Sequence, residues 1–128
     1  MKRIPSTIFI FCFVITSSFA TDYTFNVFSG DWNVAGNWSP NGIPGIGDKA
    51  IIDLGRTVNI AIATAVDIVE LKNNGIISGT ENLTINSNFN WSSGSLNGAG
   101  FVILTGTLTA STNSTHAIGG SKELHISG

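Results

Sequence analysis

The sequence predicts an all-β fold, a parallel β-solenoid with an N-terminal cap. Three observations lead to this prediction: short runs of alternating apolar and polar residues, Gly and Asn clusters between those runs, and a weak repeat of about 20 residues. A β-sandwich is the alternative fold, because strands that recur every 8–12 residues suit a sandwich as well. We favour the solenoid because the runs are very short and no neighbouring pair of runs forms a clear hairpin.

Residues 1–20 have the layout of a secretory signal peptide. Lys2 and Arg3 provide a basic start, residues 8–15 form an uncharged apolar run, and Ser18 and Ala20 are small residues before a cleavage point. The apolar run is shorter than the roughly 20 residues that a membrane-spanning helix needs. We therefore predict cleavage after Ala20, a secreted or outer-surface location, and no membrane insertion of the mature segment.

The mature chain would be acidic and free of cysteine. Cleavage would leave residues 21–128, and the single cysteine, Cys12, would be removed with the signal peptide. This excludes a disulfide framework and a cysteine-ligated metal site. Removal of two of the six basic residues would leave four against eight acidic ones, a formal charge of 4 − 8 = −4. Nucleic-acid partners are not expected, because they require a basic surface.

Short strands account for most of the mature chain. Successive side chains of a strand point to opposite faces, so each alternating run would bury one face and leave the other in water. Gly and Asn clusters tolerate the backbone conformations of sharp turns and would join the strands. The runs include residues 58–62, 83–85, 89–91 and 124–126, and the turn clusters include residues 73–75, 92–94, 97–98 and 119–120.

A weak internal repeat indicates stacked coils. Residues 79–86 resemble residues 120–127 at an offset of 41, and residues 98–105 fit the same register between them. This alignment places Val102 under Leu83, and the two steps along the chain are 98 − 79 = 19 and 120 − 98 = 22. A spacing of about 20 residues suits one coil of a solenoid, in which each coil buries its apolar side chains against the next.

The segment before the coils carries the most distinctive motif of the chain. It covers roughly residues 31–62, with Trp32, Asn37-Trp38-Ser39, Pro40, Pro44 and Gly47-Asp48 among its residues, and a later stretch from Trp91 to Leu108 follows the pattern of the coils. This pattern resembles the N-terminal segment of bacterial secreted β-helix proteins, including large adhesins, autotransporter-like passengers and type IX secretion substrates. The resemblance implies a cap followed by coils, but it implies no single activity, because that group mixes adhesins, structural surface proteins and glycan-active enzymes.

The cap is expected to cover the end of the first coil, where apolar side chains and strand edges would otherwise be exposed. Trp38 would fold over that end, Pro44 would favour an irregular crossing because it cannot donate a backbone hydrogen bond, and Asp48 would accept backbone N–H groups. We therefore divide the chain into a signal peptide (1–20), a cap (21–48) and coils (49–128). Because Gly128 follows closely on an expected strand, we expect further polypeptide after it.

Trp32 is the best candidate for a ligand-binding residue. Aromatic faces stack on sugar rings, and Trp32 is flanked by the polar residues Asp31 and Asn33. The alternative is that Trp32 and Trp38 serve only the cap and that Trp91, which follows Phe89 at the period of a strand, belongs to the core.

No catalytic residue or metal site is predicted. His116 and His125 are nine residues apart and fit no metal motif, and the chain has no Gly-x-Ser-x-Gly elbow for a nucleophilic serine. The carboxylate pairs nearest in sequence, Asp48 with Asp53 and Asp67 with Glu70, are read as solvated surface acids. Calcium is the one metal ion considered, since it takes oxygen ligands, but the Asp-rich nonapeptide repeat of calcium-binding β-rolls is absent. No cofactor is therefore predicted.

These observations favour a non-enzymatic extracellular or cell-surface β-helix protein, either an adhesin or a structural surface module. The alternative is a glycan-binding module or the N-terminal part of a glycan-active β-helix enzyme. Surface glycans or other surface proteins are the expected partners.

Overall fold

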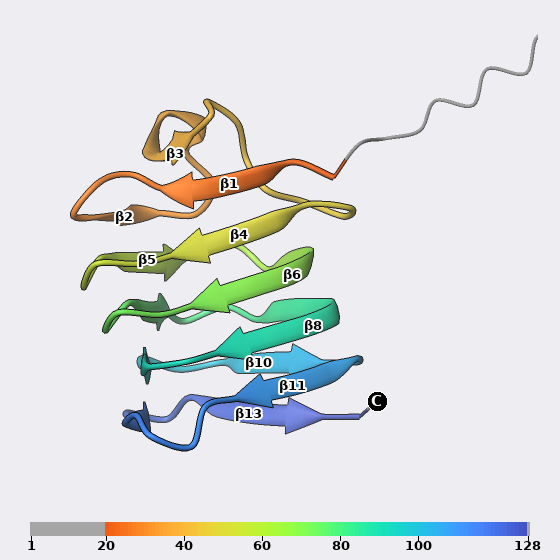
Figure 1. Ribbon diagram of the computed structural model, residues 1–128. Helices are drawn as coiled ribbons and strands as arrows, with labels where there is room; N and C mark the ends of the chain where they lie inside the picture. The colour runs from red at the N-terminus through yellow and green to blue at the C-terminus, as the bar shows by residue number, and fades with distance from the viewer. Residues whose placement is uncertain (1–19, 128) are drawn as a thin grey trace, which may run out of the picture.

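The computed structural model describes residues 20–127, so the predicted signal peptide lies outside the described residues except for Ala20. The chain forms an all-β solenoid of about four turns, with one short 3-10 helix (Figure 1). This confirms the predicted fold class and excludes the sandwich. The elements are β1 (Asp22–Phe25), β2 (Ser29–Asp31), η1 (Ala35–Asn37), β3 (Trp38–Ser39), β4 (Lys49–Ile52), β5 (Thr57–Ile60), β6 (Thr64–Leu71), β7 (Ile76–Gly79), β8 (Leu83–Trp91), β9 (Gly94–Leu96), β10 (Phe101–Leu104), β11 (Thr107–Ala110), β12 (His116–Ile118) and β13 (Glu123–Ile126).

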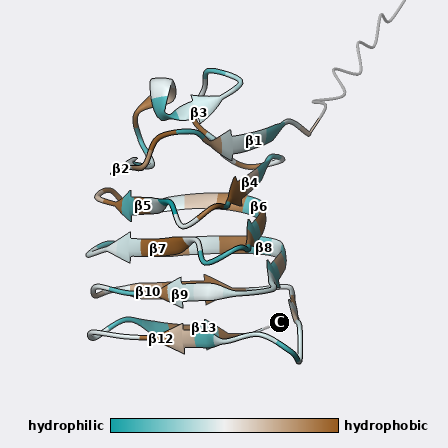
Figure 2. Ribbon diagram, turned by 60° about the vertical axis from the view of Figure 1, so that its left-hand side comes forward, coloured by the Kyte–Doolittle hydropathy of each residue, from teal (hydrophilic) through white to brown (hydrophobic). Residues whose placement is uncertain are grey.

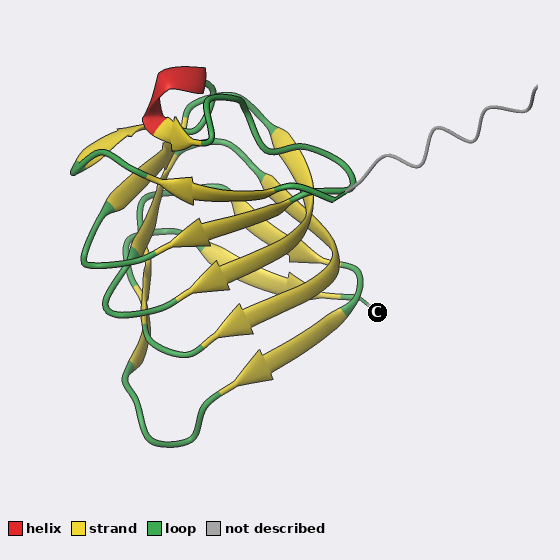
Figure 3. Ribbon diagram, turned by 45° about the horizontal axis from the view of Figure 1, so that its top comes forward, coloured by secondary structure: helices red, strands yellow, loops and turns green. Residues whose placement is uncertain are grey.

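The strands stack into three walls around a shared interior (Figure 3). We call these wall 1 (β1, β4, the second half of β6, the second half of β8, and β11), wall 2 (β2, β5, β7, β9 and β12) and wall 3 (the first half of β6, the first half of β8, β10 and β13). Every pair of strands is parallel except β1 with β3. The hydrogen bonds of the sheets therefore run from one coil to the next.

The register agrees with the repeat found in the sequence. Val102 is paired with Leu83 in the coil before it and with Leu124 in the coil after it. These pairs correspond to the predicted steps of 102 − 83 = 19 and 124 − 102 = 22 along the chain. The prediction that these three positions stack is confirmed.

Inward side chains of successive coils form continuous apolar columns. In wall 1 one column consists of Phe25, Ile52, Leu71 and Trp91, each no more than 5% exposed. Figure 2 shows hydrophobic stretches recurring along the stacked strands, with hydrophilic segments at many turns between them. Burial of apolar surface, at roughly 25 cal/mol per Å², together with the backbone ladders, holds the described coils in place without a disulfide.

A column of glycines lets the corner between walls 2 and 3 close tightly. Gly79, Gly98 and Gly120 occupy this corner in consecutive coils, with φ angles of 107°, 90° and 65°. A Cβ atom on Gly98 would meet the carbonyl oxygen of Gly79, and one on Gly120 would meet that of Gly98. Glycine is required here because the backbones of adjacent coils approach too closely for any side chain.

The N-terminal end of the stack is closed by two tryptophans. The Trp32 indole N–H donates to the Pro44 carbonyl at 3.1 Å, and the Trp38 indole N–H donates to the Trp32 carbonyl at 2.8 Å. The two rings meet edge to face at 4.9 Å, and Trp38 meets Phe25 in the same way at 5.0 Å. The segment from η1 to β3 thereby lies over the first coil (Figure 1).

The solenoid sheets begin earlier than the predicted boundary at residue 49. β1 is paired in parallel with β4, and β2 with β5, so residues 22–31 already form part of a coil. The stretch of chain between Asp22 and its partner Lys49 is longer than that between paired strands of the later coils, because η1, β3 and a loop are inserted before the coil resumes. The cap is therefore an insertion in the first coil, and the expected continuation after Gly128 lies outside the described residues.

Candidate binding groove

A surface groove of about 370 Å³ lies on wall 1, where β6, β8 and β11 reach the corner that leads to wall 2. It spans three consecutive coils. Its lining consists of Glu70, Lys72, Asn90, Trp91, Ser92, Thr109, Ala110 and Ser111.

Strand register brings these residues together from three distant parts of the chain. Glu70 is paired with Asn90, and Asn90 with Thr109, so their side chains form one outward row across the coils. Two residues further along each strand, Lys72, Ser92 and Ser111 form a second row at the corner. Neighbouring strands of a sheet lie about 4.8 Å apart, so each row carries a polar side chain at that spacing.

A register shift in β6 is what aligns the first row. The shift falls between Val66 and Ile68, and it raises the offset between paired positions of β6 and β8 from 83 − 64 = 19 to 88 − 68 = 20. A slip of one residue moves a side chain to the opposite face of a sheet. Without the shift, Glu70 would face the inward residue Phe89 instead of Asn90.

Trp91 and Ala110, which are paired in adjacent strands, lie between the two polar rows, and Trp91 is 5% exposed. The inward column above them contains the large side chains of Phe25, Ile52 and Leu71. Ala110 continues this column with only a methyl group.

Trp91 is held in a fixed orientation. Its indole N–H donates to the Gly94 carbonyl at 3.2 Å, and its ring stacks on Phe89 with 5.5 Å between the centroids. The His116 ring packs edge to face against it at 5.0 Å, and His116 Nε2 lies 2.7 Å from the Trp91 carbonyl. Because a carbonyl oxygen can only accept, Nε2 of His116 carries the proton of this hydrogen bond.

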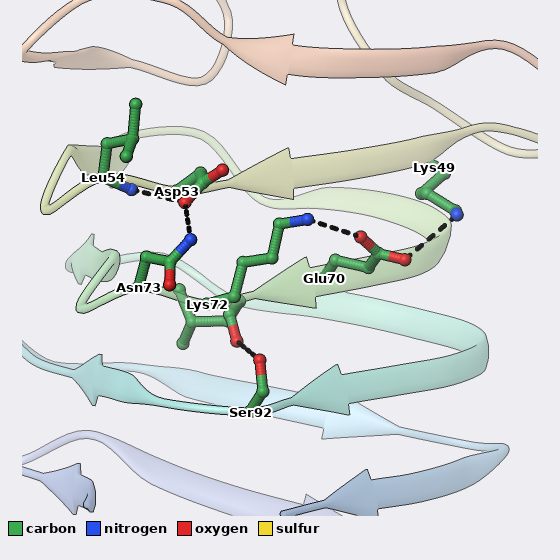
Figure 4. A network of polar contacts seen from close by, with 8 residues as sticks. Lys49, Asp53, Leu54, Glu70, Lys72, Asn73 and Ser92 are labelled. Carbon is green, nitrogen blue, oxygen red and sulfur yellow. Dashed lines mark hydrogen bonds and ion pairs between the residues drawn. The ribbon is translucent and has the colours of Figure 1, made fainter. Parts of the chain in front are cut away.

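The charged residues at the upper end of the groove form one cluster, in which a single carboxylate contacts two lysines (Figure 4). The Glu70 carboxylate lies 3.1 Å from Lys49 Nζ and 3.6 Å from Lys72 Nζ. Glu70 is the only acid among the lining residues. The common mechanisms of glycoside hydrolysis use two carboxyl groups across the scissile bond, and the lining contains one.

Several polar groups of the lining are oriented by the coil above or by a neighbouring side chain. Ser111 Oγ donates to the Ser92 carbonyl at 2.9 Å, and Ser92 Oγ donates to the Leu71 carbonyl at 3.4 Å. Asn88 Nδ2 donates to Asn90 Oδ1 at 2.7 Å. Both serine oxygens keep lone pairs with which to accept a hydrogen bond, and Asn90 keeps its NH₂ group as a donor.

The ligand-binding residues predicted from the sequence lie in the cap, away from this groove. The Trp32 ring is fully buried, so its placement does not support the hypothesis that it stacks on a sugar. Asp31 Oδ1 accepts from Asn59 Nδ2 at 2.7 Å, and the Asp31 carbonyl accepts from Asn37 Nδ2 at 3.0 Å. Asn33 Oδ1 is buried without a hydrogen-bond partner among the described residues.

The remaining predicted residues also lie in the cap. Trp38 is 2% exposed, Pro44 accepts the indole hydrogen bond described above, and the Asp48 carboxylate accepts from the Gly45 N–H at 3.0 Å and the Thr21 N–H at 3.2 Å. Asp48 and Asp53 flank the two ends of β4, five residues apart. At about 3.3 Å per residue this is roughly 16 Å, too far apart to act as a hydrolytic pair.

The groove itself was missed by reasoning from the sequence. The interpretation of Trp91 as a core residue is confirmed, but it gave no indication of a groove beside it, and Glu70 was paired only with Asp67. Extending the repeat register of Leu83 and Val102 along the strands would have placed Asn90 over Thr109, at the same offset of 19. A fixed offset of 19 does not find Glu70, the third member of the row, because the register shift in β6 makes its offset to Asn90 one residue longer.

Within residues 20–127, no three His, Cys, Asp or Glu side chains gather in an arrangement that could hold a metal ion. The part of the chain that the structure describes also contains no helix long and apolar enough to cross a membrane. The prediction of no cofactor, with calcium as the alternative, stays a prediction.

Comparison with family models, curated proteins and solved structures found no match to this chain. The chain is therefore classified by its architecture alone, as an all-β parallel solenoid with stacked coils.

Proposed function

We propose that this chain is a non-enzymatic extracellular or cell-surface module, of adhesive or structural type, which binds its target through the groove on wall 1. The observation that carries the proposal is the lining of the groove. Polar side chains recur in register over three coils. The coils of β8 and β11 contribute amide and hydroxyl groups, and the coil of β6 contributes Lys72 and the single acid, Glu70, which is held between two lysines. The amide and hydroxyl groups of this surface can bind a ligand, and its single carboxylate is engaged by the two lysines.

The solenoid suits this role because it presents the groove on a rigid support. Each lining strand is hydrogen-bonded to a neighbouring strand, and the inward side chains beneath are packed in continuous columns. A preformed surface loses little conformational freedom on binding. The predicted signal peptide supports an extracellular setting, in which surface glycans and surface proteins are available as partners.

Retention of the purified full chain on immobilised extracellular polysaccharides and glycoproteins tests the proposal. Ala110→Trp would fill the groove, whereas Ala61→Trp, at an exposed turn outside the groove, is the matched control. We expect the wild type and Ala61→Trp to be retained on at least one polymer, Ala110→Trp to be lost from it, and no soluble fragments to be released.

Two results would contradict the proposed function. Release of reducing ends or peptides by the wild type, but not by Ala110→Trp, would show that the groove is catalytic. Equal retention of wild type and Ala110→Trp would show that binding takes place elsewhere. Circular dichroism of both tryptophan variants establishes that they fold.

A further inference from the structure

We propose that the groove takes a segment of a neutral polysaccharide, an uncharged polyhydroxylated chain, lying parallel to the solenoid axis across β6, β8 and β11. This inference rests on the proposed function and specifies the ligand of the same site.

Charge balance argues for an uncharged ligand. The two ionic residues that line the groove, Glu70 and Lys72, have opposite charges and lie 3.6 Å apart. Lys49, just beyond the lining, makes a closer contact to the same carboxylate, at 3.1 Å. An anionic chain would have to compete with Glu70 for these lysines, and a cationic chain would have to displace them from Glu70.

The uncharged polar groups match hydroxyl groups in particular. Asn90 offers an NH₂ donor, Ser92 and Ser111 offer oxygen acceptors because their protons are already donated, and the Thr109 hydroxyl can serve as either. A sugar hydroxyl donates and accepts at once, so it can use both kinds of group. A phosphate or carboxylate only accepts and would leave the two serine acceptors unmatched.

The shape of the groove sets the direction and length of the ligand. The rows that begin at Glu70 and Lys72 both run across the coils, so the space between them runs along the solenoid axis. Three strands span two strand spacings, roughly 10 Å. A volume of about 370 Å³ lies at the lower end of small-molecule sites, which are about 300–1,000 Å³. This suits a short oligosaccharide segment held between the two polar rows.

A peptide strand is a poorer match because the groove lies on the face of a sheet. Extended peptides are recognised mainly through backbone hydrogen bonds to a free strand edge. In the groove, β8 is paired on both sides, with β6 and with β11. At β6 and β8 the face therefore offers side chains alone, namely Glu70, Lys72 and the amide and hydroxyl groups of Asn90 and Ser92. Of the three strands of the groove, only β11 is paired on one side alone within the described residues.

The test is an array of neutral, anionic and cationic oligosaccharides, followed by titration calorimetry of the full chain with the best neutral binder. We expect neutral glycans to bind with an affinity that changes less than about threefold when salt is raised, since no net charge is neutralised. Asn90→Ala and Thr109→Ala should each weaken binding, by about tenfold for one lost hydrogen bond. Lys72→Gln should have a smaller effect, and Ala61→Trp should have none.

The outcomes separate this inference from the proposed function. Binding only to anionic glycans, with strong salt dependence and loss in Lys72→Gln, would overturn the neutral ligand while leaving a groove-mediated function intact. Binding to proteins but to no glycan, if Ala110→Trp abolishes it, would also overturn the neutral polysaccharide as ligand and leave the groove-mediated function intact. If Ala110→Trp binds as the wild type does, or if the chain degrades the glycan, the proposed function fails together with this inference.

Discussion

Replacement of Gly98 by alanine tests whether the coils are stacked as closely as the structure shows. Gly98 has a φ angle of 90°, and an added Cβ would lie against the Gly79 backbone, 2.9 Å from its nitrogen and closer still to its carbonyl oxygen. That oxygen already accepts a hydrogen bond from the Ala99 N–H at 2.8 Å. The neighbouring atoms belong to backbone, so they cannot rotate out of the way as a side chain would.

Two effects set the expected loss of stability. An L-residue at positive φ costs about 1–2 kcal/mol relative to glycine, and overpacking of one carbon against a rigid neighbour costs about 1–3 kcal/mol. The sum, about 2–5 kcal/mol, is a large part of the roughly 5–15 kcal/mol by which domains of this size are stable. Gly98→Ala should therefore shift the midpoint of unfolding substantially.

Urea denaturation followed by circular dichroism measures this shift, with Gly36→Ala as the control. Gly36 has no heavy atom within 4 Å of its hypothetical Cβ and no positive φ, so its variant should stay within about 0.5 kcal/mol of the wild type. An equal denaturant dependence in all three proteins makes the midpoints comparable. If Gly98→Ala is as stable as Gly36→Ala, the backbones of adjacent coils do not approach each other as described.

Three further substitutions probe the cap, a buried lysine and the groove. Trp32→Phe removes the indole hydrogen bond and leaves the buried Pro44 carbonyl without that donor, so it should cost about 1–3 kcal/mol in the same assay; an unchanged midpoint would refute a structural role for this contact. Burial lowers the pKa of Lys122, which donates to the Ala99 carbonyl at 2.6 Å. The unfolded chain then holds this proton more tightly, so stability should rise as the pH approaches about 10.4, and Lys122→Met should flatten that rise in midpoints measured against pH. Glu70→Gln should cost less than about 1 kcal/mol, because the ion pairs are partly exposed, and the difference should shrink at high salt; a larger, salt-independent loss would contradict this.

The stacking of the coils was predictable because each coil follows the same rule. Leu83, Val102 and Leu124 recur at nearly equal intervals, and the alternation of apolar and polar residues around them fixes which face is buried. Glycines and asparagines between the runs mark the corners. Such a pattern is visible in the sequence because each coil repeats the same arrangement of strands and turns.

The boundary of the cap and the burial of Trp32 could be established only from the tertiary structure. A tryptophan flanked by Asp31 and Asn33 fits an exposed binding residue as well as a buried one. Its burial is decided by contacts with Trp38 and Pro44, which lie further along the chain, beyond the reach of strand alternation. Sequence patterns report the local alternation of a strand, but they do not report which irregular segment folds back over it.

By itself, the sequence determined that this chain forms short strands, stacks them in coils of about 20 residues and carries a distinct segment ahead of the regular coils. Only the tertiary structure decided where the groove lies. The shift between Val66 and Ile68 turns Glu70 toward Asn90, and the register of β8 and β11 places Asn90 beside Thr109. Both depend on the register between strands one coil apart, and this register is fixed by the packing of the whole column of inward side chains.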